Sequence, residues 1–350
     1  MRTLTKDIGV SGFVASKSAS AQLPIKRILI SRPNHRLGNL LLITPLLKEV
    51  SLTFPEAKID LFVKGGIAPV LFQNYDNIDR IIQLPRKPFK ELSAYIKVWT
   101  KIKGRKYDLV INVDGTSSSG RLCTQFANAH YKIYGPEDRI GNEKLGDRQH
   151  IAKAPVLLLR DFCREFGYGA REGKVPSLDL NLTQTEREHG KAIVEDLVKN
   201  NRETICLFTY ATGEKCYNEE WWTGFYDRLK EAASDYNIIE VLPVENISKI
   251  NFKAPTFYSK DVREIGSVIA ATAVFIGADS GIMHLASASQ AVTLGLFSVT
   301  NMLKYAPYND NSIGLDTNTC EIEELLAALL EKLTVIPEAG PAPRLISPVI

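Results

Sequence analysis

The sequence has few cysteines, and none of them lies close to another in the pattern that a metal site needs. Its five cysteines are scattered over 350 residues without a Cys-x-x-Cys motif. An odd, dispersed set argues against a disulfide framework and a structural zinc site, and it favours reduced thiols. We therefore expect a cytoplasmic protein.

An excess of charge of one sign and a long hydrophobic run are also missing. Lys and Arg number 43 and Asp and Glu number 40, which leaves a net charge of +3. Nucleic-acid-binding domains usually carry a marked basic excess, so we expect no nucleic-acid partner. No stretch approaches the roughly 20 apolar residues that span a bilayer. We therefore expect a soluble protein, at most peripheral to a membrane.

The remaining composition is that of a globular protein. Hydrophobic residues make up 45% and charged residues 24% of the chain, which argues against disordered, collagenous and coiled-coil classes. At roughly 150 residues per domain, the length predicts two domains. Residues 1–24, rich in Ser, Ala and Gly, are expected to form a flexible extension and not a secretion signal. Residues 335–350, which contain four prolines, are expected to form a loose tail.

Short β-branched runs alternate with segments of helical period, the pattern of parallel strands joined by crossover helices. Gly and Pro cluster near residues 170–182 and mark a boundary between two Rossmann-like domains, residues 25–175 and 176–334. Strands are expected at residues 27–31, 58–63, 79–84, 108–113, 204–209, 238–242, 274–276 and 292–297. Helices are expected at residues 38–54, 89–103, 119–128, 186–199, 219–235, 262–271, 281–289 and 322–333.

The first candidate site is the turn after the first strand, which begins S-R-P-N-H-R-L-G-N at residue 31. Loop amides and a helix N-terminus meet there at the carboxyl edge of the sheet, and Arg32, His35 and Arg36 add positive charge. The turn is either an anion-binding or acceptor-binding loop or a solvated loop with incidental charges. The three-glycine dinucleotide fingerprint is missing.

A second candidate is the turn Y-A-T-G-E-K-C-Y-N-E-E-W-W, residues 210–222. Thr212 and Gly213 can bring backbone donors close to a phosphate, and Lys215 offers a point charge that suits a diphosphate. The alternative is a surface lysine ahead of a helix whose aromatic residues simply pack.

The third candidate is A-D-S-G-I-M-H-L-A-S-A, residues 278–288, directly after a strand. Asp279, Ser280 and Gly281 fall where a helix begins, so donors converge on one anionic group while Asp279 can accept sugar hydroxyls. His284 lies one turn further along. An ordinary helix cap followed by a packed histidine would give the same pattern.

Together these turns resemble glycosyltransferase family nine, the heptosyltransferases of lipopolysaccharide assembly, over about residues 26–333. F-P-E-A-K-I-D-L-F-V at residue 54 and Y-D-L-V-I-N-V-D-G at residue 107 are similar to further segments of that family. The resemblance implies an α/β GT-B fold: two Rossmann-like domains facing across a cleft, with the acceptor mainly on the first and the nucleotide sugar mainly on the second.

The chemistry that the resemblance implies is inverting transfer of a heptose or related sugar from a nucleoside-diphosphate sugar, with ADP-heptose as a candidate donor. The acceptor would be a lipopolysaccharide-type or other surface glycan, and neither metal nor other cofactor would be needed. Lys215 would contact the donor phosphates, Ser280 and Gly281 would form the phosphate-binding pair, and Asp279 would face the sugar.

One departure from the family concerns the base that must take the proton of the acceptor hydroxyl. The usual Gly-Asp appears as Gly38-Asn39, and an amide does not accept that proton at neutral pH. Asp114, at the end of a strand, is the best substitute, although it is equally a turn aspartate before Gly115. If no carboxylate takes this role, the transfer activity is expected to be weak or lost.

Two further departures lie in the second domain. Leu242-Pro243-Val244 stands where many relatives carry glycines, which leaves Glu245 as a ribose contact. The family's usual Gly-Pro is absent after residue 297, which leaves Thr300 and Asn301 as sugar contacts.

The helix expected at residues 89–103 places apolar residues on one face, namely Phe89, Leu92, Ile96, Trp99 and Ile102. It either covers the sheet with solvated lysines outside, or it rests its basic side on anionic lipid at the inner face of the inner membrane. The cations in question are Arg86, Lys87, Lys90, Lys97, Lys101, Lys103, Arg105 and Lys106.

Two alternatives to transfer keep the same fold. Asn39 is compatible with a non-catalytic nucleotide-sugar-binding protein. A nucleotide-sugar epimerase of GT-B type would turn over the donor without an acceptor.

Overall fold

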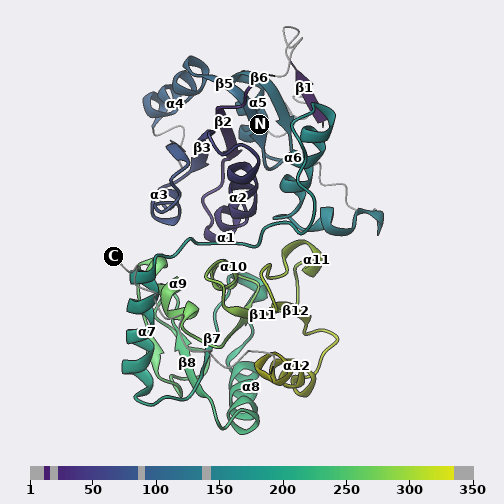
Figure 1. Cartoon of the computed structure of the whole chain (residues 1–350). Coiled ribbons are helices and arrows are strands. Elements are labelled where there is room, and N and C mark those ends of the chain that lie inside the picture. The colour runs from purple at the N-terminus through teal and green to yellow at the C-terminus, as the bar shows by residue number, and fades with distance from the viewer. Residues whose placement is uncertain (1–11, 16–22, 86–90, 136–142, 335–350) are drawn as a thin grey trace, which may run out of the picture.

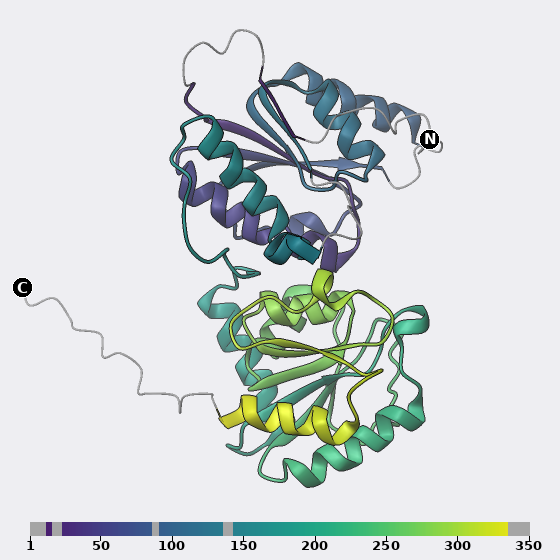
Figure 2. The same cartoon turned by 90° about the vertical axis from the view of Figure 1, so that its right-hand side faces the viewer.

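The computed structural model describes residues 12–15, 23–85, 91–135 and 143–334. They form two α/β lobes, one above the other in Figure 1, and each lobe is built on a six-stranded sheet. Figure 2 shows helices on both sides of each sheet. This confirms the predicted α/β class with two parallel sheets.

In the first lobe the strand order is β1-β6-β5-β2-β3-β4, and the sheet is parallel except for β1, which pairs antiparallel with β6. Its strands are β1 Gly12–Ala15, β2 Arg27–Arg32, β3 Lys58–Lys64, β4 Ile78–Leu84, β5 Lys106–Asn112 and β6 Asn128–Tyr134. Its helices are α1 Leu37–Leu41, α2 Thr44–Thr53, α3 Ala68–Leu71, α4 Leu92–Gly104, α5 Ser118–Phe126 and α6 Ala154–Glu165, with a 3-10 segment at Glu143–Gln149.

In the second lobe the order is β12-β11-β10-β7-β8-β9, with parallel pairing throughout. Its strands are β7 Thr204–Phe208, β8 Asn237–Val241, β9 Thr256–Phe257, β10 Val274–Ala278, β11 Val292–Phe297 and β12 Ile313–Asp316. Its helices are α7 Gln184–Val198, α8 Glu219–Ala232, α9 Val262–Ala270, α10 Gly281–Ala288, α11 Met302–Tyr305 and α12 Ile322–Thr334, with a 3-10 turn at Gly213–Lys215.

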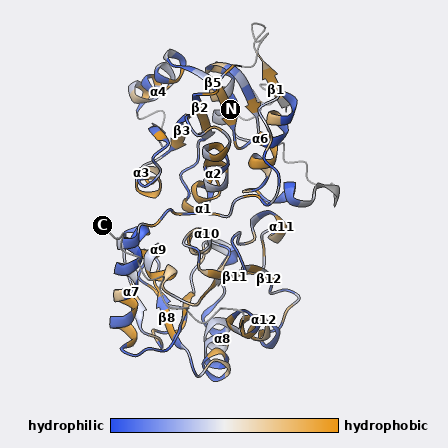
Figure 3. Cartoon of the chain, viewed as in Figure 1, coloured by the Kyte–Doolittle hydropathy of each residue, from blue (hydrophilic) through white to orange (hydrophobic). Residues whose placement is uncertain are grey.

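The strands are hydrophobic on both faces because helices cover both faces of a parallel sheet. In β2, Ile28 and Ile30 pack toward α2 and α6, whereas Leu29 packs toward α4 and α5. In β7, Ile205 and Leu207 pack toward α8 and α12. Figure 3 shows hydrophobic residues along the strands and along one side of the surrounding helices.

Several expectations need correction. The helix predicted over residues 38–54 is two helices, because the chain turns after Leu41 and α2 starts again with Pro45 in its first turn. Residues 12–15, predicted to lie in a flexible extension, form β1 on the sheet edge. The rest of that extension apart from residues 23–24, and the predicted tail at 335–350, lie outside the described residues. The boundary near residue 175 stays a prediction.

The helix expected at 89–103 is present as α4, but its buried face differs from the one predicted. Val98 and Ile102 are its buried residues, whereas the side chains of Leu92 and Ile96 are exposed. Phe89 lies outside the described residues.

The segment that joins the lobes is bound to both of them. The Asp179 amide donates to Thr44 Oγ1 at 3.0 Å, and the Leu180 amide donates to the Ala288 carbonyl at 2.7 Å. Arg263 of α9 is buried and donates to the carbonyls of Leu71 in the first lobe and Leu180 in the joining segment. These contacts hold α3, the joining segment and α9 together on one side of the molecule.

The lobes also meet at α1 and α10, which lie against each other in Figure 1. A Cβ at Gly38 would lie 2.7 Å from His284 Cδ2, and one at Gly281 would lie 3.2 Å from Leu37 Cβ. Glycine at both positions lets the two helices touch. None of the described helices is long and apolar enough to cross a membrane.

Candidate functional site

On the second lobe, four of the predicted residues converge at the carboxyl end of β10. Asp279 follows the strand and is buried, with Oδ2 3.2 Å from Lys215 Nζ. Thr300 donates its hydroxyl to the same oxygen at 2.6 Å, and His284 Nε2 lies 3.9 Å from Asp279 Oδ1. The structure therefore brings Lys215, Asp279, His284 and Thr300 into one polar cluster.

The backbone beside this cluster presents the N-terminus of α10. Ser280 is its cap, and its Oγ accepts from the Met283 amide at 3.2 Å, which leaves the hydroxyl hydrogen available to another acceptor. Gly281 is the first helical residue. An anion placed here meets orphan amides and the positive end of the helix dipole.

His284 is held as a neutral side chain. It is 4% exposed, and burial lowers its pKa to about 4, with the charges of His150 and Lys215 acting in the same direction and Asp279 against it. Its Nδ1 has no hydrogen-bond partner among the described residues. Its ring lies against Gly38, so this residue belongs to the contact between the lobes as well as to the Asp279 cluster.

The other residues predicted on this lobe lie nearer the solvent. Thr212 caps the 3-10 turn that carries Lys215, and Gly213 begins that turn with φ +67°, a backbone conformation that suits glycine. Both residues are exposed. Glu245 is exposed in the turn after β8, and no contact places it with the Asp279 cluster.

On the first lobe, a buried arginine joins the two residues considered for the base. Arg32 ends β2, and its Nη1 donates to Asp114 Oδ2 at 2.7 Å. Its Nη2 donates to Asn39 Oδ1 at 2.9 Å. Arg32 is 3% exposed and makes these hydrogen bonds with internal partners. Its role as an acceptor contact stays a prediction.

Asp114 is held ionised. Burial raises its pKa, but the Arg32 charge and the hydrogen bonds from Thr116 and Arg32 outweigh burial and bring the pKa below its usual value. Thr116 donates to Oδ1 through both its amide, at 3.0 Å, and its hydroxyl, at 2.7 Å. Asp114 is available as a carboxylate at neutral pH, and its basicity is weakened by these partners.

Arg32, Asn39 and Asp114 line a cavity of about 240 Å³ between the lobes. Its second-lobe wall comes from α11, and its remaining wall comes from the segment around residues 148–154. Arg148, Lys304 and Tyr305 in these walls were not predicted, because no sequence pattern connects them with the turn after β2. His35 and Arg36, predicted as acceptor contacts, are exposed in the loop before α1.

The arrangement places a polar cavity between the lobes and a helix N-terminus on the second lobe, and the lobes meet nearby at Gly38 and His284. No group of three or more His, Cys, Asp or Glu side chains within the described ranges is placed to hold a metal ion.

Comparison with known proteins connects this arrangement with one family. The family model described as glycosyltransferase family 9 (heptosyltransferase) matches residues 259–327. These include Asp279, His284 and Thr300 of the cluster but not Lys215. Lipopolysaccharide heptosyltransferase 3 of Escherichia coli K12 is 23% identical over 303 residues, which cover 79% of this chain and 84% of the relative. The chain is similar to glycosyltransferase family 9 in sequence.

Solved structures of the same family have the same fold. The family 9 protein of Veillonella parvula superposes with a TM-score of 0.70 at 17% identity, over 90% of this chain and 99% of the other. Escherichia coli heptosyltransferase WaaC with ADP superposes with a TM-score of 0.64 at 18% identity, over 88% and 98%. The GT-B fold implied by the sequence is confirmed.

Proposed function

We propose that this protein is an inverting, metal-independent glycosyltransferase of family 9 that moves a heptose or related sugar from a nucleoside-diphosphate sugar to a lipopolysaccharide-type or other surface glycan acceptor. The observation that carries the proposal is the Lys215–Asp279–Thr300 cluster at the N-terminus of α10, beside the Arg32–Asp114 cavity. The E. coli relative whose structure contains ADP supports an ADP-linked donor.

Binding of the donor would replace hydrogen bonds within this cluster by hydrogen bonds to the donor. Lys215 would leave Asp279 for the diphosphate, where it and the α10 amides stabilise the negative charge that grows on the leaving group. Asp279 would then accept hydroxyls of the transferred sugar. Preorganised donors of this kind are often the largest contribution to catalysis.

The acceptor would enter the cavity from the first lobe, with Asp114 as the general base. A positioned base contributes about 10²- to 10⁴-fold in rate. Inversion follows from a single displacement in which the hydroxyl oxygen bonds to the anomeric carbon as the diphosphate oxygen leaves. The hydroxyl proton passes to Asp114.

The first test is calorimetric titration of ADP, GDP and UDP, then of ADP-heptose and GDP- and UDP-sugars, into the wild type and Lys215→Ala in EDTA. We expect saturable binding by one nucleotide, weakened at least tenfold in the variant. Glu214→Ala, a change in the same 3-10 turn, is the matched control and should bind normally. Absence of binding by every nucleotide would overturn the proposal.

The base is tested by two variants in the presence of the donor and an acceptor. Asp114→Asn should lower turnover by 10² or more while donor binding is kept. Asn39→Asp places a second carboxylate where the amide oxygen now accepts from Arg32, and it should raise turnover if the family's base position is functional. Full turnover in Asp114→Asn would exclude Asp114 as the base.

One observation favours a second function, binding of a nucleotide sugar without transfer. Asn39 is not a base, and the charge of Asp114 is neutralised by Arg32. A non-catalytic protein would bind the donor, release no nucleoside diphosphate with any acceptor, and gain nothing from Asn39→Asp. An epimerase of this fold would instead convert the donor sugar with no acceptor present.

A further inference from the structure

The outer helical layer of the first lobe, formed by α4 and α5, carries no acidic residue. The sequence of α4 is L-S-A-Y-I-K-V-W-T-K-I-K-G and that of α5 is S-S-G-R-L-C-T-Q-F. Lys97, Lys101 and Lys103 of α4 are exposed. A surface helix normally mixes both signs of charge, whereas this layer is basic apart from the exposed Glu91 that caps α4.

Large apolar side chains are exposed between these cations. Leu92 is 59% exposed, Ile96 is 54% exposed and Phe126 at the end of α5 is 56% exposed. Trp99 is half-buried and lies against Phe126, with ring centroids 6.5 Å apart. The fold does not use Leu92 and Ile96, because α4 packs on the sheet through Val98 and Ile102.

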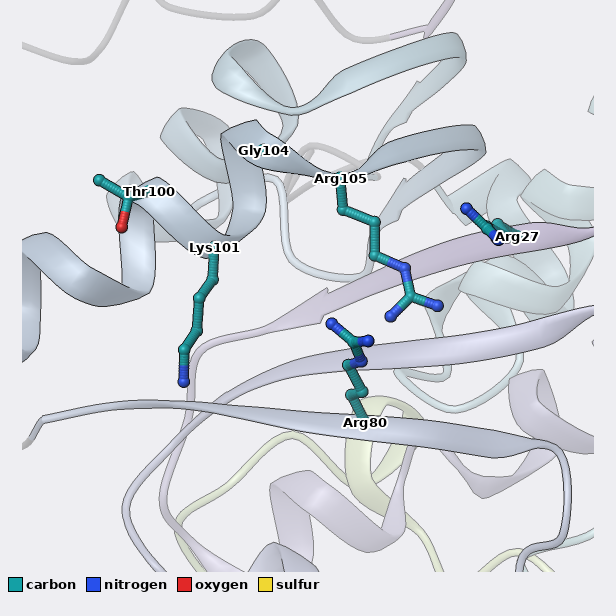
Figure 4. Close-up of a pocket in the computed structure, with 6 residues that line it drawn as sticks. All are labelled: Arg27, Arg80, Thr100, Lys101, Gly104 and Arg105. Atoms are coloured by element: carbon teal, nitrogen blue, oxygen red, sulfur yellow. The ribbon is translucent and has the colours of Figure 1, made fainter.

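A basic hollow adjoins the last turn of α4. It has a volume of about 410 Å³ and is lined by Arg27, Arg80, Lys101 and Arg105, with Thr100 and Gly104. Figure 4 shows Arg80 and Arg105 pointing toward each other, and Lys101 extending from the helix toward the strand of Arg80. The hollow is of a size to take a phosphate group.

Two carboxylates only partly neutralise this hollow. Asp79 Oδ2 accepts from Arg105 Nη2 at 2.6 Å and lies 3.8 Å from Arg80 Nε. Asp60 is buried, with Oδ2 3.4 Å from Arg105 Nη1. No ion pair joins Arg27 or Lys101 to an acid among the described residues, so two of the four cations remain for an external anion.

We infer that this face, defined as the exposed side of α4 and α5 together with the basic hollow, docks onto an anionic lipid bilayer. The cations would lie against the headgroup phosphates while Leu92, Ile96 and Phe126 enter the headgroup region. The inference goes beyond the proposed function, since docking requires neither a donor nor an acceptor.

The positive charge of this face favours an anionic bilayer over a second copy of the chain as its partner. A second copy of the chain in a two-fold contact would place the same cations against each other. A bilayer instead offers many negative charges and a place for isolated apolar side chains. Exposed apolar residues among cations that outnumber the acids are the pattern that such a surface recognises.

The experiment is co-sedimentation of the full chain with vesicles of phosphatidylcholine containing 30 mol% phosphatidylglycerol, and with vesicles of phosphatidylcholine alone. We expect binding to the anionic vesicles, weakened by added salt because the attraction is screened, and no binding to the neutral ones. Lys97→Glu/Lys101→Glu should weaken binding at least about 30-fold, since each lost cation contributes roughly fivefold and each new carboxylate adds repulsion.

Two further variants separate charge from apolar insertion. Lys191→Glu/Lys230→Glu changes two exposed lysines of the second lobe by the same charge and should leave binding within about twofold of wild type. Leu92→Ser/Ile96→Ser should weaken binding at least fivefold without removing its salt dependence. Both changes are at exposed positions, and circular dichroism checks that the fold is kept.

Three results would overturn the inference. They are equal binding to neutral and anionic vesicles, equal losses in the α4 and second-lobe charge variants, and no sedimentation with either vesicle. A concentration-dependent dimer that Leu92→Ser/Ile96→Ser dissociates in the absence of lipid would assign the face to self-association instead. Donor titration by calorimetry is unaffected by any of these outcomes, so failure of docking is distinguishable from failure of the proposed function.

Discussion

Replacing His284 by glutamine is expected to remove a large part of the acid sensitivity of the second lobe. His284 is 4% exposed, and its pKa in the folded protein is lowered to about 4 from 6.5, mainly by burial. The unfolded chain therefore binds more protons than the folded chain as the pH falls below 6.5. Stability is fully present above that pH and is lost as the pH falls toward 4.

The magnitude follows from the pKa difference. A shift of about 2.5 units corresponds to about 3 kcal/mol, since one unit is about 1.4 kcal/mol, and about 2 kcal/mol of it is lost between pH 7 and pH 5. Glutamine does not titrate in this range and keeps an amide near the position of Nε2. His284→Gln should therefore show a shallower decline of the free energy of unfolding as the pH falls.

The measurement is urea unfolding followed by tryptophan fluorescence at half-unit steps from pH 7.5 to pH 5, for wild type and variant. Comparing slopes cancels other groups that titrate, such as Glu186, whose pKa is lowered to about 2 chiefly by its hydrogen bond with Arg263. Parallel declines in the two proteins would refute the reasoning and would mean that the imidazole is solvated or charged in the folded state.

Further predictions concern packing and a buried ion pair. Gly190→Ala should lower the free energy of unfolding by about 1–3 kcal/mol, because a Cβ there would lie 2.2 Å from a carbonyl oxygen of α9. Gly224→Ala, in α8 with nothing within 4 Å of the added Cβ, should raise it by about 0.5–1 kcal/mol, and urea unfolding of both variants compares them. Glu49→Ala should cost about 3–5 kcal/mol, because it leaves Arg160 buried without the carboxylate that it meets at 2.7 Å and 3.0 Å. The double change Glu49→Met/Arg160→Met should recover most of that loss, and a double variant no more stable than Glu49→Ala would show that the cost is not one of unpaired charge.

The sheets could be predicted from the sequence because parallel strands that are buried on both faces have continuous runs of apolar residues. The segment R-I-L-I-S-R predicted β2 within one residue. The strand Asn128–Tyr134 was missed because its exposed and half-buried positions carry Asn, His and Lys, and it lies beside the edge strand β1. The run that includes Ile43 was predicted as one helix, since its periodicity does not reveal a backbone turn before Pro45.

The candidate site was predictable only where all its members follow the ends of strands. Asp279 and Lys215 come after β10 and β7, neighbours in the sheet, so topology alone brings them together. The hydrogen bonds from Arg32 to Asp114 and Asn39 depend on the directions of the side chains, which the spacing of residues in the sequence does not reveal. The walls supplied by α11 depend on how the lobes face each other, which the sequence does not state.

The contacts of Arg263 have a mechanical consequence. Its guanidinium donates hydrogen bonds to the carbonyls of Leu71 and Leu180 and to the carboxylate of Glu186. These bonds fix the separation of the two lobes along this edge of the molecule. Any rotation of one lobe against the other that keeps these bonds has its fulcrum at this edge. A tilt of a few degrees about this edge would displace the opposite edge most, where α11 lines the Arg32 cavity, so the cavity would widen there with little rearrangement elsewhere.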